Sequence, residues 1–446
     1  MDMNLFIDRV LAAAKAAGIE TAEVYCVTGE NFRASAMDGE INQYQVSASA
    51  GLSLRGTVQG KMGYSATQAF DEAAITQLVE GVKESAALVE TKEQDEIFQG
   101  DESYPELPEE ESDLKDVTPE QKLEMCLAME KAAKDADPRI WKVQRAMVST
   151  SSSTVTIRNS YGLNLTDSGT MCMAYAAPIA KEGDKTATGG WMATGFRFAD
   201  LNPVAIGVKA AEETVCQLGG SPVPGGEYRI ILRFDAMQSL LQTFCGIFSA
   251  ENAQQNMSLL GGKEGTVIGS PAVTLMDDPL LPGGHGSQRF DAEGSASRTK
   301  AVIDAGVLTT LLHSRKTARK QGVASTGNAS RASYTAPVRV APTNLYFKAG
   351  EKSLEALMAD VGEGLVITDL AGLHSGANPT SGDFSLLSKG YTIEGGQRGR
   401  AVEQITIAGN FYEVLKNIVA FADDLDFSMG SIVSPSVDIG TLKVSG

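Results

Sequence analysis

The first 220 residues carry the same succession of hydrophobic patterns twice. Apolar residues recur every three or four positions from Leu5 to Ala14, which predicts an amphipathic helix. A second helix is predicted over 118–136, because Thr118 is a capping residue and Pro119 suits the first helical position. Apolar and polar residues then alternate over 22–67 and over 141–199, which is typical of antiparallel strands. Breaks between strands are predicted at four turn signals, namely Gly29-Glu30, Asp38-Gly39, Gln59-Gly60 and Asn159–Gly162.

A closing helix follows each set of strands. The first begins near Asp71, a good N-terminal cap, and the second covers 203–218. Both contain the triplet Gly-Val-Lys. We therefore interpret residues 1–220 as one domain with a tandem duplication, in which units 1–90 and 117–220 each have the order helix, antiparallel strands, helix.

Glycine and proline crowd residues 219–226, which predicts a boundary between two domains. Beyond this run, residues 226–446 are predicted to form a second domain of short strands and turns. Helices are expected there at 235–249, at 353–361 and at 411–422. Helices and antiparallel strands mix without regular βαβ alternation, so the predicted fold class is α+β, with a strand-rich C-terminal domain.

The charge balance narrows the classes of partner. The chain has 38 Lys and Arg against 56 Asp and Glu, a formal net charge of −18. Such a chain repels phosphate groups, so direct binding to nucleic acid or to an anionic membrane is not expected. The N-terminus lacks a secretory pattern, no run of about 18 apolar residues predicts a membrane span, and the five widely spaced cysteines predict free thiols. A cytoplasmic protein is expected.

The acidic excess is concentrated in residues 90–116, which hold twelve acidic residues and two lysines. Two prolines and the absence of periodicity predict an exposed linker over 91–116. An acidic docking strip is the alternative interpretation.

The sequence contains no self-sufficient catalytic motif. There is no GxxxxGK[ST], no GxGxxG after a strand, no GxSxG and no HExxH. His285, His313 and His374 are far apart, so surface or packing roles are expected for them, and no zinc site. The acidic clusters at Asp277-Asp278, Asp291/Glu293 and Asp423-Asp424/Asp426 are interpreted as solvated turn residues, with metal binding or acid–base chemistry as the alternative.

Two polar, glycine-rich segments stand out, at 325–330 and at 375–384. Glycine lets a ligand backbone approach closely, and Ser, Thr and Asn supply hydrogen-bond donors and acceptors. A cleft for an extended peptide is one interpretation, and tight loops that satisfy their own backbone are the other. The candidate cleft residues are Ser325, Thr326, Gly327, Asn328, Asn378, Thr380, Ser381 and Gly382.

These segments resemble the TldD/PmbA family, the peptidase family formerly named modulator of DNA gyrase. The resemblance covers nearly the whole chain and is strongest in its C-terminal half. The blocks that carry it are FDAEG at 290–294, TARKQGVASTGNASR at 317–331, VGEGLVITDLAG at 361–372, GANPTSGDFS at 376–385 and VEQITIAGNFYEVLKNIVAFADDL at 402–425.

One branch of that family carries HExxxH on the helix after the first strand of its C-terminal domain. There, two histidines bind zinc and the glutamate activates the metal-bound water. In this chain the segment LLQTFCGI places Gln242, Thr243 and Ile247 at the His, Glu and His positions. The resemblance therefore implies a degenerate metallopeptidase helix without catalytic or metal-binding residues, similar to the PmbA branch, also called TldE.

The resemblance further implies a non-catalytic subunit that has no cofactor of its own. It would pair with a zinc-bearing, TldD-like HExxxH subunit, or with a second copy of itself, and the pair would cleave unfolded or leader peptides held extended in a cleft. Two alternatives stay open. One is an independent hydrolase that uses a histidine with Asp291 or Glu293, and the other is a homodimeric peptide-binding module.

Overall fold

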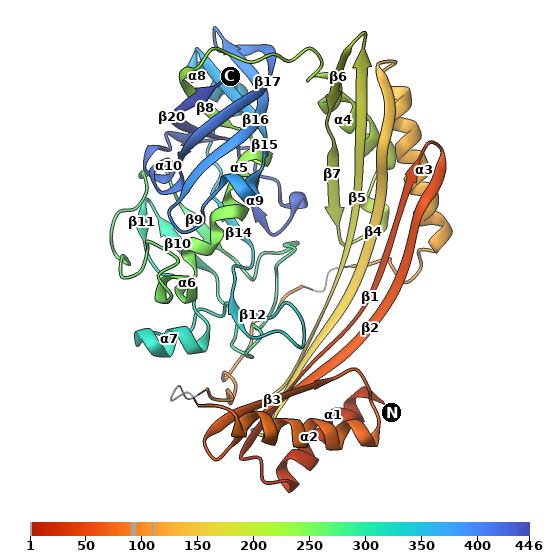
Figure 1. Cartoon of the computed structure of the whole chain (residues 1–446), viewed down its shortest axis with the longest axis vertical. Coiled ribbons are helices and arrows are strands. Elements are labelled where there is room, and N and C mark those ends of the chain that lie inside the picture. Colours follow the sequence, from red (N-terminus) through yellow and green to blue (C-terminus); the bar gives the residue numbers. More distant parts are fainter. Residues whose placement is uncertain (1, 91–94, 109–110) are drawn as a thin grey trace.

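The computed structural model describes residues 2–90, 95–108 and 111–446 and has a mixed α+β fold (Figure 1). One large, curved antiparallel sheet dominates the N-terminal half, and the strand-rich C-terminal half packs along one side of it. Within the described ranges, no helix is both long and apolar enough to cross a membrane.

The N-terminal sheet is long because four of its strands have 17 to 20 residues each. Its strand order is β3-β2-β1-β4-β5-β6, and β7 also pairs with β5. The antiparallel pair β1 and β4 joins the two predicted units at the centre of the sheet. The strands are β1 (Thr21–Met37), β2 (Glu40–Val58), β3 (Lys61–Thr67), β4 (Ile140–Asn159), β5 (Asn164–Glu182), β6 (Lys185–Thr188) and β7 (Trp191–Gly195).

Two pairs of helices cover the two ends of this sheet (Figure 1). Helices α1 (Met3–Ala16) and α2 (Glu72–Ala87) pack on Val24 and Cys26 of β1. Phe32 and Ala34 of the same strand are covered by helices α3 (Pro119–Ala136) and α4 (Pro203–Val215). A short 3₁₀ helix, η1 (Phe198–Asp200), precedes α4. Because side chains alternate along a strand, these four even-numbered residues lie on one face, and both helix pairs cover that face.

Several local signals of the sequence are confirmed in this half. Asp71 accepts a hydrogen bond from the N–H of Ala74 at 2.9 Å, and Thr118 forms a capping box at the start of α3. The Asp38-Gly39 turn has φ values of 59° and 81°. The break expected at Gly29-Glu30 is wrong, because Gly29 pairs with Ser49 on one side and Ser153 on the other. Pairing on both sides overrides the local turn signal.

Both predicted units have the order helix, antiparallel strands, helix. The glycine of each Gly-Val-Lys triplet lies at a close approach: a Cβ on Gly81 would be 2.5 Å from Ser65 Oγ, and one on Gly207 would be 2.5 Å from the Met129 carbonyl oxygen. Ser65 belongs to β3 and Met129 to α3, so the two glycines face different neighbours. The duplication stays a prediction.

Two larger sheets share one hydrophobic core in the C-terminal half. Their strand orders are β17-β16-β15-β8-β20-β18 and β11-β10-β9-β14-β19, while β12 pairs with β13. The strands are β8 (Gly226–Leu232), β9 (Leu275–Asp277), β10 (Lys300–Asp304), β11 (Val307–Leu308), β12 (Ala329–Ser330), β13 (Arg339–Val340), β14 (Leu345–Phe347), β15 (Gly364–Ala371), β16 (Asp383–Glu394), β17 (Gln397–Asn410), β18 (Ala420–Phe421), β19 (Ile432–Val433) and β20 (Val437–Ser445). The helices are α5 (Phe234–Phe244), η2 (Cys245–Phe248), α6 (Ala250–Gln254), α7 (Arg315–Gln321), α8 (Leu354–Val361), α9 (Leu373–Gly376), α10 (Phe411–Asn417) and η3 (Phe427–Met429).

Two helices of this half are shorter than predicted. The helix expected at 235–249 ends its α-helical part at Phe244 and continues as the 3₁₀ turn η2, after which Ser249 caps α6. The helix expected at 411–422 ends at Asn417, because the N–H of Val419 donates to Asp438 and the chain then joins β20 as β18. The helix expected at 353–361 is confirmed as α8.

The described part of the acidic connector is exposed over much of its length, as predicted, but it also docks on the rest of the protein at a few points. Residues 95–108 have neither helix nor strand, yet Ile97 is 5% exposed. The side chain of Asn159 donates to the Phe98 carbonyl at 2.5 Å, and the Tyr104 hydroxyl donates to the Gly294 carbonyl at 2.8 Å. The connector therefore contacts both halves of the protein. Residues 91–94 and 109–110 of the predicted linker lie outside the described residues.

Candidate functional site

Helix α5 positions the segment at which the family resemblance places a degenerate zinc site. Its apolar residues Met237, Leu240, Leu241 and Phe244 recur at helical spacing, and all four are fully buried. Phe244 stacks on Phe411 of α10 with ring centroids 4.8 Å apart. The helix is thus anchored in the core by one face, and its last turn carries the first two positions of the motif.

The three motif positions have different surroundings. Gln242 is exposed, and its side-chain amide donates to the Ile432 carbonyl at 3.4 Å. Thr243 donates its hydroxyl to the Ser239 carbonyl of the preceding helical turn at 2.8 Å. Ile247 lies beyond the end of the α-helix and is 1% exposed within the core. Zinc needs thiolate, imidazole or carboxylate ligands, so this set of side chains does not fit zinc.

Cys245 is the one thiol in the same segment. It is partly buried, and its thiol donates to the Gln242 carbonyl at 3.2 Å. Burial raises the pKa of this thiol to about 11. The thiol is therefore protonated at neutral pH, which disfavours a nucleophilic role because that role needs the thiolate.

The three histidines lie in separate places. His285 stacks on Phe196 with ring centroids 4.9 Å apart, and its Nε2 is 2.8 Å from the Thr194 hydroxyl. His313 is 1% exposed, and its Nδ1 is 3.2 Å from the Thr317 hydroxyl. His374 is exposed on α9.

Burial lowers the pKa of both His285 and His313, so their rings are neutral near pH 7. Among the described residues no hydrogen bond or ion pair joins a histidine to Asp291 or Glu293, and no group of three or more His, Cys, Asp or Glu residues could hold a metal ion.

Two of the three acidic clusters were wrongly interpreted as solvated turn residues. Asp277 is 0% exposed and pairs with Lys300 at 2.8 Å. Asp291 and Glu293 are 1% and 6% exposed. In the third cluster, Asp424 is partly buried and accepts the N–H of Ser436 at 2.7 Å. These carboxylates hold loops of the C-terminal half together. Each accepts hydrogen bonds from donor groups of the loops that would otherwise have no partner.

Asp291 and Glu293 also face the N-terminal sheet. Burial, and then the neighbouring Glu293 charge, raises the pKa of Asp291 to about 7, although three backbone N–H groups oppose the shift. Burial likewise raises the pKa of Glu293, against the attraction of Arg55 on β2. Glu23 of β1 lies in the same junction, 2.7 Å from Arg55 and 3.4 Å from Arg331. The FDAEG block is therefore part of a buried, charged junction between the two halves.

The first glycine-rich segment is divided between the interior and a surface pocket. Asn328 is 1% exposed, and its amide group contacts Asp277 at 2.7 Å and Lys300 at 3.0 Å. Thr326 donates to the Asn328 side chain at 2.7 Å, and Gly327 takes a φ of 72°. Ser325 instead lines a pocket with charged residues of the connector, of α7 and of the loop before β10, namely Glu96, Asp101, Arg298, Arg315 and Arg319.

The second glycine-rich segment forms a tight loop before β16. The Asn378 side chain accepts the backbone N–H groups of Thr380 and Ser381 at 3.0 and 3.2 Å. The Asn410 side chain donates to the Ser381 carbonyl at 2.9 Å, and Gly382 takes a φ of 84°. In the described residues no hydrogen bond joins this loop to the first segment. A role of either loop in a cleft stays a prediction.

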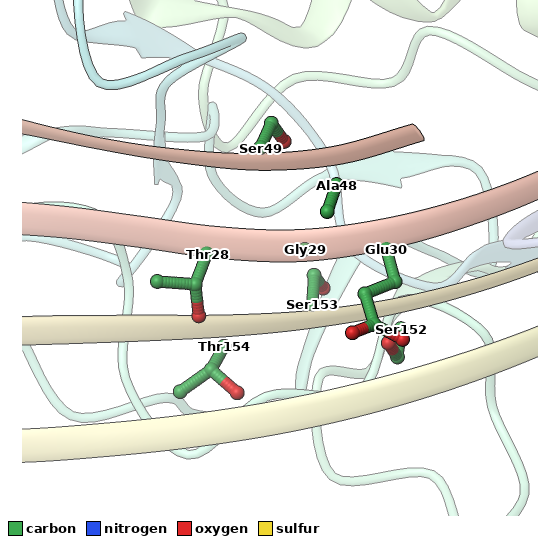
Figure 2. Close-up of a pocket in the computed structure, with 8 residues that line it drawn as sticks. All are labelled: Thr28, Gly29, Glu30, Ala48, Ser49, Ser152, Ser153 and Thr154. Carbon is green, nitrogen blue, oxygen red and sulfur yellow. The ribbon is translucent and has the colours of Figure 1, made fainter. Parts of the chain in front are cut away.

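Sequence reasoning missed a polar hollow in the middle of the N-terminal sheet (Figure 2). Thr28 pairs with Thr154 and Glu30 with Ser152, and these four side chains lie on the same side of the sheet. The hollow lies between the two helix pairs, where small hydroxyl side chains replace the apolar residues found at both ends. The run Ser149–Thr154 is the sequence signal that could have indicated it.

Family models match three consecutive parts of the chain. The model described as PmbA/TldA metallopeptidase domain 1 matches residues 22–86, the central domain matches 112–218, and the C-terminal domain matches 225–446. A crystal structure from Thermotoga maritima, described as that of a modulator of DNA gyrase, superposes with a TM-score of 0.93 at 32% identity over 100% of both chains.

Curated relatives match less completely. A metalloprotease of Methanocaldococcus jannaschii is 28% identical over 264 residues, which are 58% of this chain and 58% of that protein. Metalloprotease PmbA of Escherichia coli O157:H7 is 26% identical over 74% of this chain and 71% of its own length. The chain thus aligns with less than two thirds of the archaeal relative.

Proposed function

Because this chain belongs to the PmbA/TldD metallopeptidase family, we propose that it is a zinc-less subunit that supports a zinc-bearing partner and does not cleave peptides alone. The observation that carries the proposal is the burial of Ile247. This residue holds the place of the second histidine, and it is 1% exposed in the hydrophobic core. Hydrocarbon at this position offers no lone pair to a metal.

The other two motif positions support the same proposal. Peptide hydrolysis by this family's chemistry needs a base that takes a proton from the attacking water. Thr243 holds the place of that base, and its hydroxyl is engaged with the Ser239 carbonyl at 2.8 Å. A threonine hydroxyl has no basic character near neutral pH, and Gln242 offers only an amide. The chain therefore contributes binding and shape, and the zinc and the base come from the partner.

We further propose that the partner is a TldD-like HExxxH subunit and that the substrate is an unfolded or leader peptide, bound extended. Backbone hydrogen bonding to a strand would hold such a peptide with little sequence preference. Ser325 and the Asn378–Gly382 loop are the candidate contacts on this chain. Direct contact with DNA is not proposed, since the net charge is −18.

The test compares the purified chain, a TldD-like subunit from the same source and an equimolar mixture of both. Zinc is measured by mass spectrometry of metals, and cleavage is followed on a fluorescent unstructured peptide. We expect substoichiometric zinc and no cleavage from this chain alone, and cleavage in the mixture. The double variant Gln242→Ala/Thr243→Ala should retain cleavage within about twofold, because neither side chain takes part in the chemistry.

Matched controls separate the alternatives. In the mixture, changing the motif glutamate of the partner to glutamine should abolish cleavage. Stoichiometric metal and cleavage by this chain alone would contradict the proposal and favour an independent hydrolase. Peptide binding without any stimulation of the partner would contradict it in favour of a peptide-binding module.

A further inference from the structure

A pocket lies between the acidic connector and helix α7 of the C-terminal half (Figure 1). Its volume is about 310 Å³, which is within the range of sites for small molecules. The connector contributes Glu96 and Asp101 to its lining, and α7 contributes Arg315, Ala318 and Arg319. None of the described lining residues is a motif position of α5 or η2, so the pocket is separate from the degenerate zinc site.

Two polar atoms of the lining are buried without a hydrogen-bond partner among the described residues. They are Nε of Arg315 and the hydroxyl oxygen of Ser295, a residue that is 4% exposed. Arginine nitrogens only donate, so the Nε–H group needs an acceptor. Native proteins leave few buried donors unmet, because each one costs free energy. The two atoms therefore indicate an acceptor that the chain itself does not supply.

The guanidinium group of Arg315 is held in one orientation. Its central carbon lies 3.6 Å from the centroid of the Phe98 ring, and its backbone N–H donates to Glu293 at 2.8 Å. Nε and Nη2 form one edge of a guanidinium group, and the parallel N–H groups of such an edge match the two oxygens of a carboxylate. Here Nη2 contacts Glu96 Oε1 at 3.4 Å, whereas a good charged pair lies at about 2.7–2.9 Å. The edge can therefore take a better acceptor.

The surroundings of this edge favour an anion with a small apolar body. Helix α7 reads RKTARKQ, with four cations and no acidic residue, in a chain of net charge −18. Arg298 adds another guanidinium group to the lining. Such a local concentration of positive charge attracts anions. Ala318, Val323 and Ala324 line the same pocket and offer contacts to hydrocarbon.

We propose that this pocket binds a small organic carboxylate, whose two oxygens take the Nε/Nη2 edge of Arg315 in place of Glu96. Glu96 is suited to displacement, because its side chain is 56% exposed and lies 3.4 Å from Arg315 and 3.6 Å from Arg319. Its withdrawal opens the edge to the ligand. Asp101 stays in place, since it accepts the N–H of Ala296 at 2.7 Å. The inference goes beyond the proposed function and does not depend on it, since the pocket belongs to this chain alone.

The experiment measures binding of 4-methylpentanoate to the full chain by isothermal titration calorimetry. We expect a Kd of at most about 1 mM. The neutral analogue 4-methylpentanamide should bind at least about tenfold more weakly, because it has the same body without the charge. Inorganic phosphate should also bind more weakly, since it has no apolar body. No binding of 4-methylpentanoate up to about 10 mM would overturn the proposal, and so would equal binding of the amide or tighter binding of phosphate.

Substitutions locate the site. Arg315→Lys keeps the positive charge but loses the two-donor edge, so it should weaken binding at least about tenfold. The matched control is Arg339→Lys, since the Arg339 side chain is 63% exposed and pairs with Glu251 outside the pocket. Glu96→Gln should bind the carboxylate at least about threefold more tightly, because it removes the competing charge. Loss of structure cannot produce this gain.

Hydrogen exchange on the unchanged chain locates the ligand without any substitution. Saturating 4-methylpentanoate should slow amide exchange within residues 295–298 and 315–325. Circular dichroism should establish that all three variants are folded. Protection confined to other segments would overturn the proposal, as would unchanged binding by Arg315→Lys or weaker binding by Glu96→Gln.

Discussion

Asp291 and Glu293 lie in the tight turn after Phe290, and their surroundings decide their ionisation. Asp291 accepts the N–H groups of Glu293 and Ser295 at 2.9 Å each and that of Ala329 at 3.0 Å. Glu293 accepts the N–H of Arg315 at 2.8 Å. The turn therefore ties three loops together, and two carboxylates at its centre share an environment with little water.

The raised pKa of Asp291 predicts a pH dependence of stability. The folded chain holds this proton up to a pKa of about 7, against a usual value of 3.8. Because the folded state binds the proton more tightly, the free energy of unfolding should fall as the pH rises across this window. In the variant Asp291→Asn, the free energy of unfolding should fall less steeply with pH, and the two slopes should differ by at most about 1.4 kcal/mol per pH unit. Urea unfolding at pH 5, 6 and 7 measures both slopes.

Glu293→Gln provides the matched variant for this measurement. It keeps a carbonyl oxygen for the Arg315 N–H and removes the negative charge beside Asp291. The window in which stability falls should then move to lower pH. Parallel stability profiles for the unchanged chain and Asp291→Asn would mean that Asp291 does not titrate in this range.

At the scale of elements, the proposed zinc-less role depends on how α5 ends. The α-helix stops at Phe244, and η2 turns Ile247 into the core beside Phe248. Gln242, five residues earlier, points to the surface. The two positions therefore differ in environment as well as in residue type, and exchanging side chains does not by itself recreate a site.

We predict that Ile247→His destabilises the chain by about 2–4 kcal/mol, because it buries a polar ring without a partner. Ile247→Val, the matched control, should cost about 0.5–1.5 kcal/mol, since it removes one methylene from the same place. Thermal and urea unfolding measure both values. Unchanged stability in Ile247→His would indicate that the η2 segment can open, so that burial would not keep a histidine at this position from reaching a metal.

Elements also explain which local predictions hold. The helices after Asp71, Thr118, Ser353 and Asn410 begin where their capping residues stand, because a cap satisfies backbone groups within a few residues of itself. Helix ends without such a signal were predicted poorly. The helix at 411–422 stops early because β20 competes for the backbone of residues 419–421.

For the whole molecule, buried charges hold the two halves together. Arg331 follows β12 in the C-terminal half, and its side chain is 2% exposed. Its guanidinium lies 3.4 Å from Glu23 and over the Tyr25 ring, 4.4 Å from the centroid. Glu23 and Tyr25 belong to β1 of the N-terminal sheet, so this contact joins residues more than 300 positions apart.

We predict that Arg331→Gln lowers the free energy of unfolding by about 2–4 kcal/mol. The variant removes one of the two cations beside the buried carboxylate of Glu23 and leaves Arg55 as the other. Arg298→Gln is the matched control. The Arg298 side chain is 58% exposed and 3.7 Å from Asp101, so its loss should cost less than about 1 kcal/mol. Equal effects of the two substitutions in urea unfolding would contradict a structural role for the junction.

A double variant tests the same contact by another route. Arg331→Gln combined with Glu23→Gln should lower the free energy of unfolding by less than the sum of the two single variants.

Local chemistry in the sequence determined the element types, the hairpin turn at Asp38-Gly39 and the side chains of Gln242, Thr243 and Ile247, on which the proposed zinc-less role depends. Each of these depends on residues within one or two turns of chain. Tertiary structure alone decided that β1 continues through Gly29, that the connector docks through Ile97 and Tyr104, and that Asp277, Asp291 and Glu293 are buried. The physical reason is that strand pairing and burial depend on partners far away in the sequence, whose positions exist only after the two halves have packed.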